Sequence, residues 1–145
     1  MGKHKYFELR EFVESATAKT KGIDNTPSFV AVSHLDELVE TILDPMRAAY
    51  GKPIKVTSGF RCPELNKAVG GSPTSVHPLG YAADVQGSGD FEAFKAFVVS
   101  WFKTSGIKFD QLLLESNKAT GAKWIHIGLK NASGEQRCQI KIMEV

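Results

Sequence analysis

Three side chains that could bind a metal ion stand in two short segments of this sequence. His77 and Asp84 lie seven positions apart within residues 75–85 (SVHPLGYAADV), and His126 lies within residues 123–128 (KWIHIG). Imidazole nitrogen and carboxylate oxygen are ligands that zinc binds at about 2.0–2.2 Å. Taken alone, His77 and Asp84 are also typical of a loop histidine and a strand-end carboxylate that are satisfied locally. The segment around His126 is what favours a metal site.

The chain must turn between His77 and Asp84 if the two side chains are to meet. Pro78 and Gly80 are residues that favour such a turn. The run that begins at Ala82 is typical of a buried strand. We therefore expect a loop to carry His77 and a strand to carry Asp84.

The segment around His126 has the alternation of a β-strand. Trp124, His126 and Gly128 fall on one face, and the two isoleucines between them fall on the other. The isoleucines predict that the opposite face packs against an apolar layer. The glycine beside His126 leaves room for a ligand to approach.

A candidate general base stands on the preceding strand. Gln111, Leu113 and Glu115 share one face of that strand. Glu115 can lie close to His126 if the two strands pair in a suitable register. The sequence does not fix the register, so this proximity is a conditional prediction.

The remaining pattern predicts an α+β fold with helices in the first half packed on a small, mainly antiparallel sheet. Apolar spacing predicts helices over 7–16, from Ser33 through Met46, over 63–69 and over 90–103. We expect Ser33 to cap the second helix, Pro45 to kink it near Leu43, and residues 19–29 to form a loop. Strand patterns cover 53–57, the run from Ala82, 109–115, 123–129 and 138–144, and the last three predict an antiparallel meander.

The composition is that of an ordinary globular protein. We expect a single domain over residues 1–145, because this length can bury one core. The net charge of +2 suits an acidic polymer such as a cell wall or a nucleic acid without choosing between them. We expect a monomer with no nucleic-acid partner.

Neither a signal peptide nor a membrane span is indicated, so we expect cytoplasmic synthesis. Cys62 and Cys138 lack C-x-x-C spacing, which argues against a cysteine-based zinc site.

The pattern S-x-H-x-x-G-x-A-x-D followed by W-x-H resembles the zinc peptidases that cleave peptidoglycan stem peptides. These include D-alanyl-D-alanine carboxypeptidases and the L-alanyl-D-glutamate endopeptidases found among phage lysins. The resemblance extends over residues 7–129 and includes segments 43–47 (LDPMR), 58–66 (SGFRCPELN), 69–71 (VGG) and 109–112 (FDQL). It implies the fold that these peptidases share with hedgehog signalling domains.

The resemblance implies roles for individual residues. His77, Asp84 and His126 match the three zinc ligands, which leaves a fourth position for water. Arg61 matches an arginine near the substrate carbonyl or carboxylate, where it could stabilise an oxyanion. Ser75 is expected to orient the site by a hydrogen bond, or to be a capping serine of the loop. Ser75, Arg61 and Trp124 are the expected substrate-binding residues.

One position departs from the family pattern. Well-known relatives carry an acidic general base three residues before the last histidine, and here that position is Lys123. We expect Glu115 to be the base instead. Asp110 is a second candidate, but strand alternation places it on the opposite face.

The resemblance implies zinc-assisted amide hydrolysis of peptides that contain D-residues. A phage or prophage lysin that reaches the wall after release from the cell would fit, and so would a cytoplasmic dipeptidase or recycling enzyme. The substitution at Lys123 keeps open a second class, a zinc-containing but inactive binding module like the hedgehog domains. A purely structural zinc site is disfavoured, because such sites are usually closed by four protein ligands.

Overall fold

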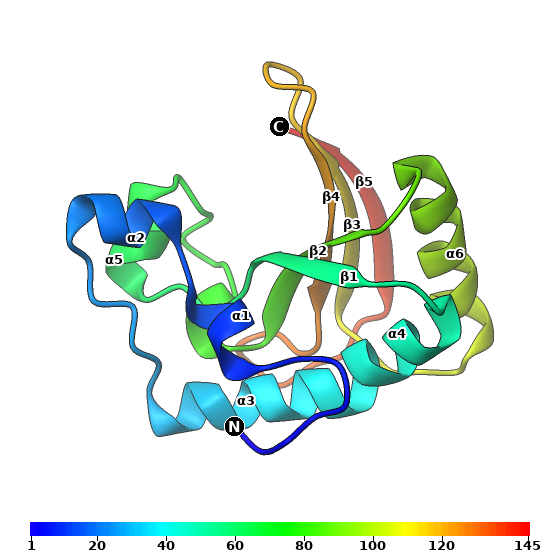
Figure 1. Ribbon diagram of the computed structural model, residues 1–145, viewed down its shortest axis with the longest axis horizontal. Coiled ribbons are helices and arrows are strands. Elements are labelled where there is room, and N and C mark those ends of the chain that lie inside the picture. Colours follow the sequence, from blue (N-terminus) through cyan, green and yellow to red (C-terminus); the bar gives the residue numbers. More distant parts are fainter.

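A five-stranded sheet forms the centre of the protein, and helices lie on both sides of it (Figure 1). The computed structural model describes residues 1–145. The helices are α1 (Leu9–Val13), α2 (Ala16–Lys21), α3 (Phe29–Leu38), the π-helical turn η1 (Val39–Leu43), α4 (Asp44–Tyr50), α5 (Pro63–Ala68), the 3-10 turn η2 (His77–Leu79) and α6 (Phe91–Thr104). The strands are β1 (Ile54–Ser58), β2 (Ala82–Gly87), β3 (Gln111–Ser116), β4 (Lys123–Gly128) and β5 (Gln139–Glu144). The predicted α+β class is confirmed.

The strands follow the order β1-β2-β4-β3-β5. The pairs β1–β2, β2–β4 and β3–β4 are antiparallel, so the sheet is mainly antiparallel as predicted. The predicted meander is wrong at its last strand, because β5 pairs with β3 in parallel rather than continuing from β4. The cause is the buried carboxylate of Asp110 just before β3. It accepts hydrogen bonds from the backbone N–H, Nε and Nη2 of Arg137 and so returns the chain to the start of β3.

One face of the sheet packs on α6 and on the continuous segment α3–η1–α4 to form the core. The predicted aromatic stripe of α6 supplies Phe94, Val98 and Phe102, which are buried. Ile125 and Ile127 of β4 are fully buried on the same side, as their alternation predicted. None of the helices combines the length and apolar character needed to cross a membrane.

The long helical segment begins earlier than predicted. Ser28 caps α3 by accepting a hydrogen bond from the backbone N–H of Ala31, so the cap predicted at Ser33 is wrong. Where the kink is predicted, the helix contains the π-turn η1, which ends at Leu43, two residues before Pro45. Proline has no N–H and crowds the carbonyl four residues earlier, and a wider turn accommodates both effects.

The N-terminal segment differs from its prediction as well. The helix predicted over 7–16 ends at Val13, because Glu14 is extended, with ψ of 134°. A second helix, α2, then occupies part of the predicted loop. Ser15 caps it by accepting a hydrogen bond from the N–H of Ala18. In Figure 1, α2 and α5 lie together on the side of the sheet opposite α6.

Candidate metal centre

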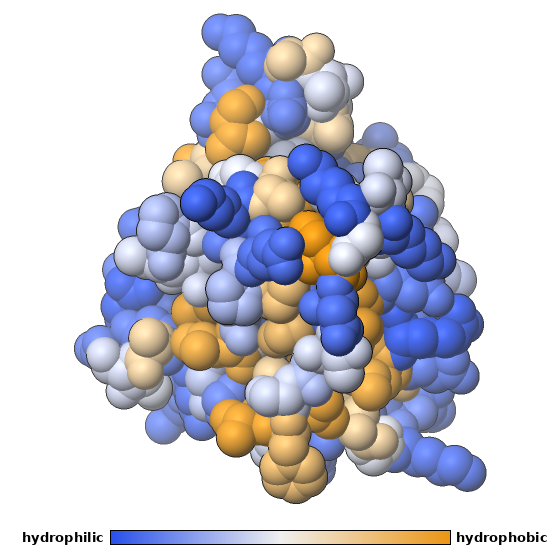
Figure 2. Space-filling model, turned by 90° about the vertical axis from the view of Figure 1, so that its left-hand side faces the viewer, coloured by the Kyte–Doolittle hydropathy of each residue, from blue (hydrophilic) through white to orange (hydrophobic).

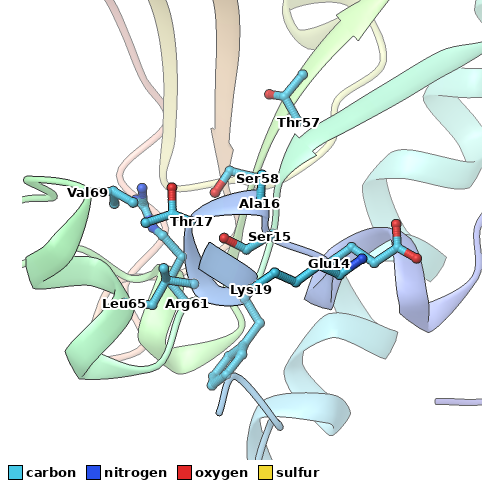
Figure 3. Close-up of a pocket in the computed structure, with 12 residues that line it drawn as sticks. Glu14, Ser15, Ala16, Thr17, Lys19, Thr57, Ser58, Arg61, Leu65 and Val69 are labelled. Atoms are coloured by element: carbon cyan, nitrogen blue, oxygen red, sulfur yellow. The ribbon is translucent and has the colours of Figure 1, made fainter. Parts of the chain in front are cut away.

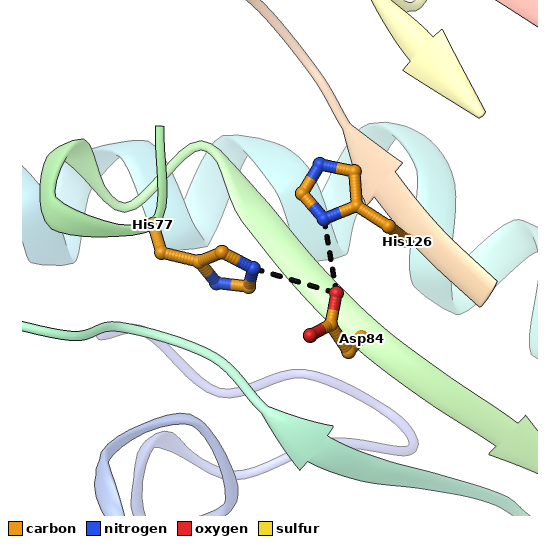
Figure 4. Close-up of side chains that lie close together, drawn as sticks. All are labelled: His77, Asp84 and His126. Atoms are coloured by element: carbon orange, nitrogen blue, oxygen red, sulfur yellow. Dashed lines mark hydrogen bonds and ion pairs between the residues drawn. The ribbon is translucent and has the colours of Figure 1, made fainter. Parts of the chain in front are cut away.

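His77, Asp84 and His126 come together on the face of the sheet opposite the apolar core (Figure 4). One ligand atom from each residue lies within 4.8 Å of the other two. His126 Nδ1 is 2.9 Å from Asp84 Oδ1, and His77 Nε2 is 3.4 Å from the same oxygen. Three potential ligand atoms therefore surround one point.

Strand register brings two of these side chains together. Asp84 on β2 stands directly opposite His126 on β4 in the antiparallel pair, and directly opposite residues point to the same face. His77 arrives from the other direction, on η2. Gly80 ends that turn with φ of 79°, and a Cβ there would lie 2.3 Å from the carbonyl oxygen of Ala31. Only glycine allows this close approach, which fixes His77 beside the sheet.

The tautomer of His77 follows from its surroundings. Its Nδ1 is 2.6 Å from the carbonyl oxygen of Gly59, and a carbonyl can only accept a hydrogen bond. Nδ1 therefore carries the proton, and the lone pair of Nε2 points toward Asp84. Burial lowers the pKa of His77 below its usual value, which keeps the ring neutral. Neutral imidazole is the form that binds a metal.

Asp84 is an anion in this site. Burial alone would raise its pKa, but the neighbouring imidazoles of His77 and His126, with the hydrogen bond from His126, hold the pKa of Asp84 well below its usual value. The proton between His126 Nδ1 and Asp84 is the one that a bound metal ion would displace. Two imidazoles and one carboxylate, buried and with one potential ligand atom each near a common point, fit a catalytic zinc site with an open fourth position.

Glu115 lies on the same face as the three candidate ligands. The observed register pairs Leu113 with His126 and Glu115 with Trp124. The two strands therefore pair in a register that places Glu115 on the same face as His126, which the sequence had left open. The indole N–H of Trp124 donates a hydrogen bond to Oε2 of Glu115. Burial raises the pKa of Glu115, and the charge of Asp84 acts in the same direction. A carboxyl with a raised pKa therefore stands beside the site.

Arg61 lies three residues beyond the end of β1, next to the loop that carries His77. Its backbone N–H is 3.4 Å from the carbonyl oxygen of His77, and its Nε is buried without a hydrogen-bond partner. Burial lowers the pKa of Arg61, whereas the charges of Asp84 and Glu115 act to raise it. The guanidinium is therefore electrostatically coupled to both carboxylates.

The Arg61 side chain also lines a cavity of about 580 Å³ between α2, β1 and α5 (Figure 3). Hydroxyl groups of Ser15, Thr17 and Ser58 and the apolar side chains of Leu65 and Val69 form its walls. Figure 2 views the molecule from the side of α2 and α5, where hydrophilic side chains surround smaller apolar patches. The mixed lining suits a ligand that has both polar and apolar parts.

The side chains of three other residues considered from the sequence are engaged elsewhere than with the three ligand atoms. The hydroxyl of Ser75 accepts a hydrogen bond from the backbone N–H of His77, so it holds the loop locally. Lys123 forms an ion pair with Glu92 of α6 at 3.4 Å. The carboxylate of Asp110 is engaged by Arg137.

Sequence reasoning missed the groups that support the ligands. The carbonyl of Gly59 orients His77, and the Thr57 hydroxyl donates to the backbone carbonyl of Asp84 at 3.2 Å. No sequence pattern marked these groups, but the structure shows why residue 59 is glycine, because a Cβ at this position would lie 2.6 Å from the backbone of Phe12. The glycine allows β1 to pass close to α1, and its carbonyl then meets His77.

Comparison with known proteins agrees with this geometry. No curated protein matched the chain. The family model described as Peptidase M15 matches residues 5–127, a segment that contains all three candidate ligands and Glu115. Since the match spans most of the sequence, the chain belongs to the peptidase M15 family.

Proposed function

We propose that the protein is a zinc-dependent peptidase that hydrolyses an amide bond in the stem peptides of peptidoglycan. The observation that carries the proposal is the convergence of His77, Asp84 and His126, with Glu115 on the same face of the sheet. A zinc ion held by the three ligands would polarise the substrate carbonyl and lower the pKa of the attacking water. The chain itself must then position the substrate, accept a proton and stabilise the developing charge.

Glu115 is the general base in this proposal. Its carboxylate takes a proton from the attacking water and delivers it to the leaving amine, a contribution of roughly 10²–10⁴-fold. The raised pKa supports this role, because a more basic carboxylate is a better proton acceptor near neutral pH. Trp124 holds the carboxylate in place through its indole N–H. Lys123 takes no part, since its ammonium is paired with Glu92.

Arg61 stabilises the negative charge that develops on the carbonyl oxygen. Its guanidinium forms no ion pair or hydrogen bond within the protein and lines the cavity, so its terminal N–H groups can serve a substrate. A guanidinium remains protonated even when burial lowers its pKa. Donors aimed at a developing oxyanion in a site with little water contribute strongly to catalysis.

The substrate class comes from the family resemblance and suits the cavity beside Arg61. A stem peptide combines small apolar alanines with free carboxylates, and the cavity walls are both apolar and polar. The cleaved bond in this proposal is D-Ala-D-Ala or L-Ala-D-Glu. A role as a wall-degrading lysin is part of the same proposal, and the net charge of +2 suits an acidic wall.

Digestion of purified peptidoglycan tests the proposal. We expect the zinc-loaded protein to release fragments whose masses locate one type of cleaved stem-peptide bond. A chelator should abolish the release, and added zinc should restore it. An inactive binding module would bind the same peptidoglycan and release nothing, even when zinc is present. That result would overturn the proposal.

A further inference from the structure

A row of four side chains crosses the sheet from the candidate metal centre to its edge strand. Asp84 on β2 is opposite His126 on β4, His126 is opposite Leu113 on β3, and Leu113 is in register with Lys141 on β5. Registered residues on neighbouring strands point to the same face. Lys141 therefore belongs to the same face as the metal centre.

A side-chain contact supports this orientation of β5. Gln111 Nε2 donates to Oε1 of Gln139 at 3.0 Å, so these registered residues share one face. Lys141 follows Gln139 by two positions and must point the same way. Its side chain is exposed. The lysines that form ion pairs are Lys95, Lys118, Lys123 and Lys130, which leaves the charge of Lys141 unpaired.

The position of Lys141 is fixed by the fold. Arg137 is bound to the buried carboxylate of Asp110 through Nε at 2.7 Å and Nη2 at 2.8 Å, just before β5 begins. The backbone N–H of Gln139 then bonds to the carbonyl of Asp110. β5 also lies beyond residues 5–127, the segment that matches the family model. This feature is therefore additional to the matched family core.

The spacing of the row sets the distance at which Lys141 can act. Neighbouring strands lie about 4.8 Å apart, so Lys141 stands about 10 Å from His126 at the level of the backbone. An extended peptide covers about 3.3–3.6 Å per residue. A peptide that crosses β4, β3 and β5 would thus pass Lys141 about two or three residues from the bond held at the metal centre.

We propose that the β3–β5 face is a substrate subsite in which Lys141 binds a carboxylate about two or three residues from the cleaved bond. This inference rests on the proposed peptidase function. Leu113 forms the apolar floor between the centre and the lysine. The subsite selects acidic stem peptides, whose free carboxylates lie along the chain, over forms in which that carboxylate is a carboxamide.

Paired peptides test the inference. Mass analysis first locates the cleaved bond in stem-peptide analogues. Glu and Gln are then exchanged at successive positions on both sides of that bond, and KM and kcat are measured for each pair. We expect the carboxylate to lower KM by about twofold to fivefold at one position, two or three residues from the bond, with kcat unchanged. High salt should reduce this preference.

Substitutions test whether Lys141 is the residue responsible for the preference for a carboxylate. Lys141→Ala should abolish the preference, and Lys141→Glu should transfer it to a peptide with lysine at that position. Lys103→Ala is the matched control, because Lys103 is an exposed, unpaired lysine in the last turn of α6; it should keep the preference. Equilibrium binding of the same pairs to the metal-free protein gives a readout independent of turnover, with the same ratios expected.

The outcomes separate this inference from the proposed function. A protein that cleaves no peptide when zinc is present refutes the proposed function. A protein that cleaves the peptides, but whose Glu-to-Gln ratios are the same in Lys141→Ala as in the wild type, refutes the subsite alone. A preference lost equally in Lys103→Ala would also refute it, because the effect would then be one of net charge.

Discussion

The indole N–H of Trp124 donates a hydrogen bond to the carboxylate of Glu115 from the directly opposite position on the neighbouring strand. This contact favours the ionised carboxylate, whereas burial and the charge of Asp84 raise the pKa of Glu115. Trp124 therefore limits how far that pKa rises. It also fixes the direction in which the carboxylate points.

Replacement of this donor should shift the pH dependence of activity. In Trp124→Phe the pKa of Glu115 should rise further, because the hydrogen bond that lowers it is lost. A base acts only when ionised, so the acidic limb of the kcat/KM profile should move to higher pH. The profile of the wild type under identical conditions is the reference. An unchanged acidic limb would show that Glu115 does not control it.

Glu115→Gln should keep the fold and the bound zinc but reduce turnover by roughly 10²–10⁴-fold. The substitution preserves shape and removes the proton acceptor. Lys123→Ala is the control, since Lys123 contacts Glu92 rather than the site, and it should keep most of the activity. Turnover, circular dichroism and zinc content would be measured for both. Near-normal turnover in Glu115→Gln would remove Glu115 from the mechanism.

The zinc site itself can be checked by elemental analysis. We expect about one zinc per wild-type chain, from the three ligand atoms that converge. His126→Ala should lose most of it, because two ligands cannot hold the ion tightly. His4→Ala is a suitable control, since His4 lies near the start of the chain and its Nε2 is 2.7 Å from Asp36 Oδ1. Equal zinc content in both variants would place the metal elsewhere.

Gly80→Ala should destabilise the protein by roughly 3 kcal/mol or more. The added Cβ would meet the carbonyl oxygen of Ala31 at 2.3 Å, and the residue would keep φ of 79°. Gly22→Ala provides the matched control, because Gly22 has φ of 65° with no atom within 4 Å of the added Cβ. It should cost only about 1 kcal/mol, from backbone strain alone. Denaturant unfolding of the two variants measures the difference, and equal losses would mean that the contact with Ala31 is unimportant.

Asp110→Asn should lower stability by about 2 kcal/mol at neutral pH, since a charged acceptor of several hydrogen bonds becomes neutral. The hydrogen bonds from Arg137 hold the pKa of Asp110 below its usual value. The stabilisation is therefore present above the unfolded-state pKa and is lost as the pH falls through the folded-state pKa. Thermal melts should show a wild-type advantage that shrinks toward low pH. An advantage that does not depend on pH would show that the charge of Asp110 is unimportant.

The sequence contained most of the information about the site. Ligand type together with the family resemblance indicated His77, Asp84 and His126, which the structure brings together, and alternation placed Glu115 on the same face as His126. Asp84 met His126 through the register of β2 and β4, and Glu115 joined them through the register of β3 and β4; packing over the whole sheet sets both registers. From the sequence, the proximity of Glu115 to His126 could therefore be stated only on the condition that β3 and β4 pair in a suitable register.

The errors in the fold arose where local signals were weak or competed with each other. Ser28 and Ser33 are both capable caps for the same helix, and the structure uses the earlier one. α2 has six residues and little apolar periodicity, so nothing in its pattern separated it from a loop. The partner of β5 was decided by the contact between Asp110 and Arg137, which are 27 positions apart. Such a contact cannot be inferred from alternation.

The three ligands sit on different kinds of secondary structure. Asp84 and His126 belong to central strands, whereas His77 is on a three-residue turn that follows an irregular segment. A metal ion shared by all three would act as a cross-link between distant parts of the chain, since Asp84 and His126 alone are 42 positions apart. By mass action, such binding would raise the melting temperature with zinc concentration. It would also slow amide hydrogen exchange more in the turn around His77 than in β2 or β4, because local opening of the turn would then require release of the ion.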